Sequence, residues 1–196
     1  MGADCLDCWQ ATPPAAGAGP VGATEWSMDW IAPAADDAPM APGSLPEAAQ
    51  RLARLGAGLP AKLAAPPAAF DATTVLETPS SRRRFYVHSS LPWNGYMGVQ
   101  MHAIGVWPAG STGWLALVEL IEPGVRETKI PRRLVRVLVG PLKLPDAPGA
   151  KHAVAPLYGL RWPENAHAEY LVATAWVEDA NGRITQIATD RCDDPK

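Results

Sequence analysis

Cysteine and charged residues are scarce in this chain, and long apolar runs are absent. The 196 residues include three cysteines, an odd number at very unequal spacing, which argues against a disulfide framework and favours a reducing compartment. No apolar run approaches the roughly 18 residues that a membrane helix needs. The formal net charge of -3 argues against binding dominated by electrostatic attraction to nucleic acid, which normally needs a clearly basic domain or stripe. We therefore expect neither a membrane nor a nucleic acid as partner.

The first ten residues lack the features of an export signal. Asp4 and Asp7 lie where a secretory signal carries positive charge followed by an apolar stretch. Heavy use of Ala, Pro, Gly and Arg is typical of a GC-rich bacterial or bacteriophage gene. We expect a cytoplasmic protein, or one that becomes part of a virion or another large assembly.

Composition divides the chain near residue 80. Residues 1–80 are rich in alanine and proline and have few aromatic residues. Most of this half lacks both the helical period and the alternation of a strand, and its prolines remove backbone donors. The sequence predicts an extended N-terminal arm at 1–80 and an antiparallel β domain at 81–196.

Two stretches of the arm carry local structure and are the expected anchors to a partner. Ser44 and Glu47 have capping-box spacing, which predicts a helix near 45–55 with an apolar stripe. A single helical turn would bring Trp26 and Trp30 side by side. The partner-binding candidates are Trp26, Trp30, Leu45, Leu52 and Leu55, together with Arg82, Arg83 and Arg84 at the junction.

Beyond residue 81 the pattern is that of short strands separated by Gly, Pro and Asn. The expected strands are 84–89, 96–107, 114–121, 132–139, 168–177 and 183–189, about six in all, and 114–121 is apolar enough to be central. No ten-residue helical pattern interrupts them. This half therefore predicts a mainly β fold, either an antiparallel sandwich or a small barrel.

Two Asn-Gly pairs predict hairpins with two-residue turns. A turn at Asn181-Gly182 puts Trp176 opposite Ile187. A turn at Asn94-Gly95 puts His88 opposite Met101 and His102 opposite Val87, so the two imidazoles leave opposite faces. A slip of one residue would put both imidazoles on the same face, and Pro92 lies beside this turn.

Metal and catalytic motifs are weak. Cys5 and Cys8 have the spacing of half a zinc site, but a structural zinc needs four ligands, and two free thiols are the favoured interpretation. The four histidines are expected to be surface or hydrogen-bonded residues. No nucleophile elbow, phosphate-binding loop or dinucleotide fingerprint is present. We expect no metal and no cofactor.

Three functional hypotheses remain open. The first is a non-catalytic assembly protein, held in a larger complex such as a phage particle, a secretion machine or a multi-subunit enzyme by its N-terminal arm; its partner is another protein or a second copy. The second is a carbohydrate- or small-ligand-binding module, with candidate ligand-binding residues Trp93, Trp107, Trp114 and Trp162. The third is a small hydrolase or isomerase using His102 with a neighbouring carboxylate.

Overall fold

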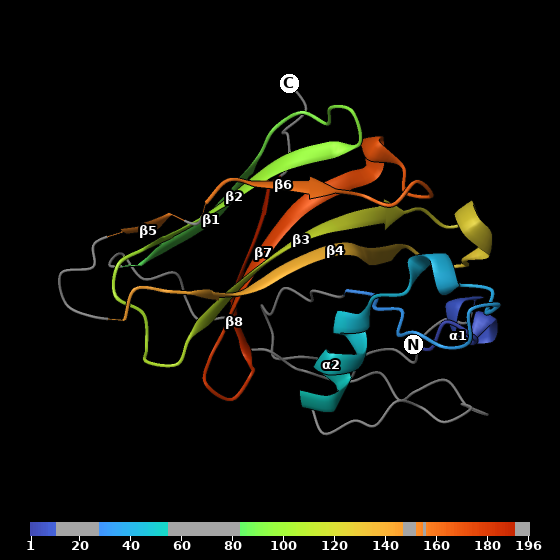
Figure 1. The fold of residues 1–196 in the computed structure, drawn as a ribbon, viewed down its shortest axis with the longest axis horizontal. Helices are drawn as coiled ribbons and strands as arrows, with labels where there is room; N and C mark the ends of the chain where they lie inside the picture. Colours follow the sequence, from blue (N-terminus) through green and yellow to red (C-terminus); the bar gives the residue numbers. More distant parts are fainter. Residues whose placement is uncertain (11–27, 55–82, 147–151, 155, 191–196) are drawn as a thin grey trace. The chain divides into compact units, whose positions relative to one another are not determined.

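The fold is mainly β, with two antiparallel four-stranded sheets and no closed barrel among the residues described (Figure 1). The computed structural model describes residues 1–10, 28–54, 83–146, 152–154 and 156–190. The prediction of a sandwich-like β fold is confirmed, although these described residues form eight strands where the sequence predicted about six. The two added strands, β5 (His152–Val154) and β6 (Tyr158–Arg161), are too short to show alternation.

The first sheet is built around β2 (Tyr96–Ile104). β2 pairs antiparallel with β1 (Arg84–Ser89) on one side and with β5 and β6 on the other. The second sheet has the order β4-β3-β7-β8, with bounds β3 (Thr112–Ile121), β4 (Arg132–Lys143), β7 (Leu171–Glu178) and β8 (Ile184–Asp190). β3 is an interior strand, as its nearly continuous apolar sequence predicted.

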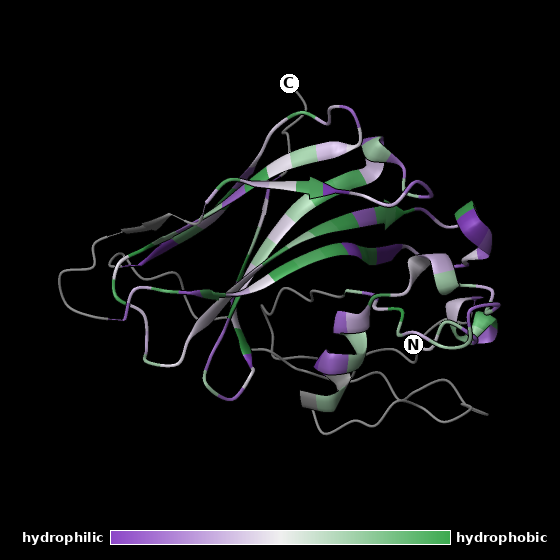
Figure 2. Ribbon diagram, in the orientation of Figure 1, coloured by the Kyte–Doolittle hydropathy of each residue, from purple (hydrophilic) through white to green (hydrophobic). Residues whose placement is uncertain are grey.

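Both sheets contribute to one apolar core. Val99 and Met101 of β2 cluster with Leu115 of β3 and Ala175 of β7, all almost completely buried. Figure 2 shows that β3 and β4 are hydrophobic along most of their length. Ser89 of β1 also binds Asp190 of β8, through its backbone amide and through its hydroxyl at 2.8 Å. These contacts tie the first sheet to the second.

The chain divides into two compact units, and β3 and β4 contribute residues to both. One unit comprises Met1–Thr73 and Glu119–Arg136, and the other comprises Thr74–Val118 and Val137–Lys196. The first contains α1 (Leu6–Gln10), η1 (Ala41–Gly43), α2 (Pro46–Arg54) and η2 (Val125–Glu127). α2 confirms the helix predicted near 45–55, whereas α1 was not predicted.

The first unit has its own small apolar cluster. Ala3, Trp9 and Ile31 of the N-terminal segments pack with Ile121 and Leu134 of the strand ends. Hydrogen bonds from Asp29 N to Arg133 O and from Val135 N to Asp29 O, at 2.8 and 3.1 Å, attach residue 29 to β4. The described part of the N-terminal region is therefore packed against strands of its own chain.

The β7–β8 hairpin has the predicted register but a different turn. Trp176 lies opposite Ile187 as expected. The turn has one residue more than predicted, because Asp179 pairs with Arg183 and its carboxylate accepts the amides of Asn181 and Arg183. A register shift between Val177 and Glu178 compensates for the extra residue.

In the part of the chain that the structure describes, no helix is long and apolar enough to cross a membrane.

Candidate functional site

Buried charges hold the first unit together at the ends of β3 and β4. Glu119 is 1% exposed, and its two carboxylate oxygens accept separate guanidinium groups, Oε2 from Arg136 Nε at 2.6 Å and Oε1 from Arg126 Nη2 at 3.1 Å. Burial lowers the pKa of Arg136, and the Glu119 charge opposes that shift. Because it binds two separate guanidinium groups, this buried carboxylate links β3 to β4 and to Arg126 within the unit.

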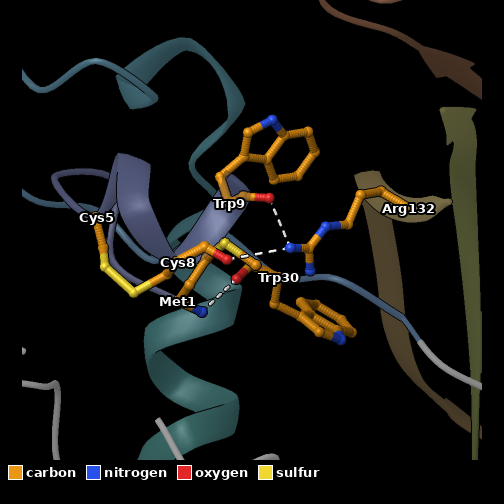
Figure 3. The surroundings of a disulfide bond; sticks show 6 residues. All are labelled: Met1, Cys5, Cys8, Trp9, Trp30 and Arg132. Carbon is orange, nitrogen blue, oxygen red and sulfur yellow. Dashed lines mark hydrogen bonds between the residues drawn. A yellow bond between two sulfur atoms is a disulfide. The ribbon is translucent and has the colours of Figure 1, made fainter. Parts of the chain in front are cut away.

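Arg132 joins the N-terminal residues to β4 (Figure 3). Its Nη2 donates to the carbonyls of Trp9 and Cys8 at 2.6 and 3.1 Å, and its Nη1 donates to Asp29 Oδ1 at 2.9 Å. The guanidinium also lies 5.3 Å from the centre of the Trp9 ring. One buried side chain therefore binds two segments that are far apart in sequence.

The arginines at the start of β4 are buried, although charged residues beside apolar strands commonly face solvent. Arg132 and Arg136 are 5% and 3% exposed. Their carboxylate partners, Asp29 and Glu119, are distant in sequence, so local patterning could not reveal the pairs. Figure 2 shows the hydrophilic stretches at these strand ends.

The expectation of free thiols at Cys5 and Cys8 was wrong. A disulfide joins them, with their Cα atoms 5.3 Å apart (Figure 3). Cys8 lies inside α1, and the helix turn that follows Cys5 brings the two side chains together. The bond closes the short segment whose carbonyls Arg132 binds.

We expect intact-mass measurement to find one alkylatable cysteine in the denatured, unreduced protein. A disulfide between Cys5 and Cys8 leaves Cys192 as the only reactive thiol of the three cysteines in the sequence. Reduction before alkylation should raise the number of labels from one to three. Three labels without reduction would show that the bond is absent.

The predicted arm anchors are placed as follows. Trp30 is partly buried and lies beneath the guanidinium of Arg51, 5.6 Å from its ring centre. Leu45 is partly buried, and its amide donates to Ile31 O at 2.9 Å. Arg83 lies over the Trp107 ring, and Arg84 is exposed. Trp26, Leu55 and Arg82 lie outside the described residues, as does the side chain of Leu52.

The four tryptophans proposed as ligand contacts have different surroundings. Trp107 and Trp114 are 2% and 3% exposed, and Trp114 stacks on Trp176. Trp162 is partly buried against the apolar core. Only Trp93 is exposed, at 82%. They form no shared aromatic platform.

The β1–β2 register differs by one residue from the predicted register. The predicted partners of both histidines were therefore wrong. His88 lies opposite Gln100, and His102 lies opposite Tyr86. The Asn94-Gly95 turn does form, with positive φ at both residues. The shift arises at Pro92, because proline has no backbone N–H to donate to the neighbouring strand. One extra residue therefore forms a bulge between the turn and β1.

Because of this shift, both imidazoles leave the same face of the first sheet. Their ring centres are 5.5 Å apart, and the Tyr86 ring stacks on His102 at 4.5 Å with an interplanar angle of 9°. Desolvation lowers the pKa of His102, and the nearby His88 lowers it further. The two imidazoles and the Tyr86 ring therefore form a compact aromatic cluster.

No general acid–base pair is visible at His102. Among the residues that the structure describes, the only histidine within ion-pair distance of a carboxylate is His167, 3.7 Å from Glu169 and exposed. The neighbours of His102 are aromatic rings. The hydrolase hypothesis therefore gains no support from this geometry.

An apolar surface lies beside the β1–β2 turn, and Trp93 is its one member that the sequence predicted as a contact residue. We call it the hairpin patch; its members are Leu91 (80% exposed), Trp93 (82%), Tyr96 (47%) and Leu157 (68%). Trp93 and Tyr96 form a doubly hydrogen-bonded backbone pair at 2.8 and 2.9 Å. A Cβ added to Gly98 would lie 3.3 Å from the Leu157 side chain, which puts Leu157 over the strand that begins at Tyr96.

No family model, curated protein or solved structure matches the chain.

Proposed function

We propose that the protein is a non-catalytic interaction protein that binds another protein through the hairpin patch. This proposal rests on the exposure of four large apolar side chains, which belong to the residues around the β1–β2 turn and to the segment beside β2. Scattered exposed apolar residues are ordinary, but a contiguous group of them commonly marks a contact surface. An assembly role within a larger complex, as inferred from the sequence, is compatible with this surface.

A protein partner fits the chemistry of the hairpin patch better than a sugar does. Leu91 and Leu157 are aliphatic, and such side chains gain from burial against another apolar surface. Trp93 adds a large, rigid ring of the kind that dominates binding energy at protein interfaces. A carbohydrate is the second candidate, because Trp93 and Tyr96 are exposed aromatics on paired backbone.

The proposed contact uses other residues than the N-terminal anchors predicted from the sequence. Trp30 is covered by Arg51, and residues 1–10 and 28–32 bind strands of their own chain. Of the predicted anchors in the arm, Trp30 and Leu45 therefore already make contacts within the protein. The hairpin patch has no comparable cover among the described residues.

Photo-crosslinking in the source cells tests this proposal. We expect a benzophenone amino acid at position 93 to crosslink one discrete protein, and the same group at position 170, an exposed tyrosine elsewhere, to crosslink none. The purified partner should bind Trp93→Ala and Leu157→Ala at least about tenfold more weakly than Tyr170→Ala.

Equal crosslinking at both positions, or equal affinity of all three variants, would overturn the proposal. Binding of an oligosaccharide that is lost in Trp93→Ala, without any protein crosslink, would replace it with the carbohydrate hypothesis. Patch-dependent dimerisation in sedimentation would identify the partner as a second copy of the chain.

A further inference from the structure

His88 and His102 form a pair on the outer face of the first sheet that the interaction function does not use. The two residues lie on neighbouring strands at diagonal register positions, because their direct partners are Gln100 and Tyr86. Diagonal neighbours on one face of a sheet lie close enough for long side chains to meet. The rings are 5.5 Å apart between centres, at an interplanar angle of 77°.

This separation suits two imidazoles that share one ion. A transition-metal ion binds an imidazole nitrogen at about 2.0–2.1 Å, so two rings on one tetrahedral ion have centres roughly 5 Å apart. His88 is exposed, whereas His102 is partly buried.

The buried nitrogen of His102 gives an independent indication. Its Nε2 is inaccessible to solvent and has no hydrogen-bond partner within the described part of the chain. Buried polar atoms in native proteins are nearly always satisfied by protein, water or an ion. The neighbouring rings of Tyr86 and His88 hold the imidazole in place, which reduces the entropy lost when it binds a ligand.

We propose that His88 and His102 bind a divalent transition-metal ion of the zinc, nickel or copper type, with water completing its coordination. Imidazole favours these ions over magnesium and calcium, which prefer oxygen ligands. The backbone register pairs His152 with Ile104, on the strand next to His102. Its substitution is therefore included in the test as the histidine whose backbone lies on the neighbouring strand.

Isothermal titration of the oxidised full-length protein with zinc chloride and nickel chloride tests the site. We expect one ion to bind with the same affinity in the unmodified protein and in His167→Ala, a matched histidine outside the pair. Binding should be at least about tenfold weaker in His88→Ala and in His102→Gln. Since His88 is exposed, His88→Ala should fold normally, which its circular dichroism checks.

Binding that is unchanged in His88→Ala and His102→Gln would overturn the site, as would loss in His152→Ala alone. Loss in all three variants would support it and add His152 to the ligands. The titration is repeated in Cys192→Ser, because a thiol also binds these ions; disappearance of binding there, with the histidines intact, would likewise overturn the proposal. Calcium chloride should give no heat of binding.

Discussion

Replacing Glu119 with alanine is expected to lower the free energy of unfolding by about 3–5 kcal/mol. The carboxylate is 1% exposed and accepts hydrogen bonds from Arg136 at 2.6 Å and Arg126 at 3.1 Å. Its removal leaves the buried Arg136 guanidinium without that negative partner. A buried charge that loses its partner costs far more than an exposed ion pair contributes. Urea denaturation followed by tryptophan fluorescence measures the change.

Glu122 provides the matched control for this experiment. It follows Glu119 by three residues and is exposed, so Glu122→Ala should change the stability by less than about 0.5 kcal/mol. Equal effects of the two substitutions would mean that the pairs of Glu119 with the two arginines contribute little to the fold.

Replacing Arg132 with alanine is expected to release residues 1–10 from the strand ends. The guanidinium donates to the carbonyls of Cys8 and Trp9 and to Asp29. Hydrogen bonds to charged groups contribute about 1.5–3 kcal/mol each, so several are lost together. We expect the amides of residues 1–10 to exchange hydrogen at least about tenfold faster, as measured by mass spectrometry.

Arg84→Ala is the control for Arg132, because Arg84 is exposed on β1. It should leave exchange in residues 1–10 unchanged. Unchanged exchange in Arg132→Ala as well would show that other contacts hold the N-terminal segment.

Local sequence signals predicted the β elements well and the register less reliably. The apolar run at 114–121 identified an interior strand, and the capping spacing at Ser44 identified α2, because these signals reside in the element itself. The Asn181-Gly182 pair indicated a hairpin, but Asp179 lengthened its turn by accepting two amides. At Pro92 a single bulged residue moved both histidines to one face. A change of one residue in strand register depends on a single backbone hydrogen bond, so it is difficult to infer from composition.

The contacts of the N-terminal region could not be predicted for a different reason. Its proline and alanine content indicated an arm that cannot form a core alone, and its cluster does borrow Ile121 and Leu134 from the strands. The pairs of Arg132 with Asp29 and of Arg136 with Glu119 join residues 103 and 17 positions apart in sequence. No periodicity connects such residues. The hairpin patch as a whole was not predicted, because its members flank the Asn94-Gly95 turn or precede β6 and share no sequence periodicity.

Hydrogen exchange of the free protein and of its complex with the crosslinked partner tests the central claim most directly. The account predicts that residues 1–10 and 28–32 are already protected in the free protein, and that binding adds protection at 90–98 and 157–160. The opposite pattern, with unprotected N-terminal residues that become protected only in the complex, would contradict it and restore the N-terminal arm as the anchor.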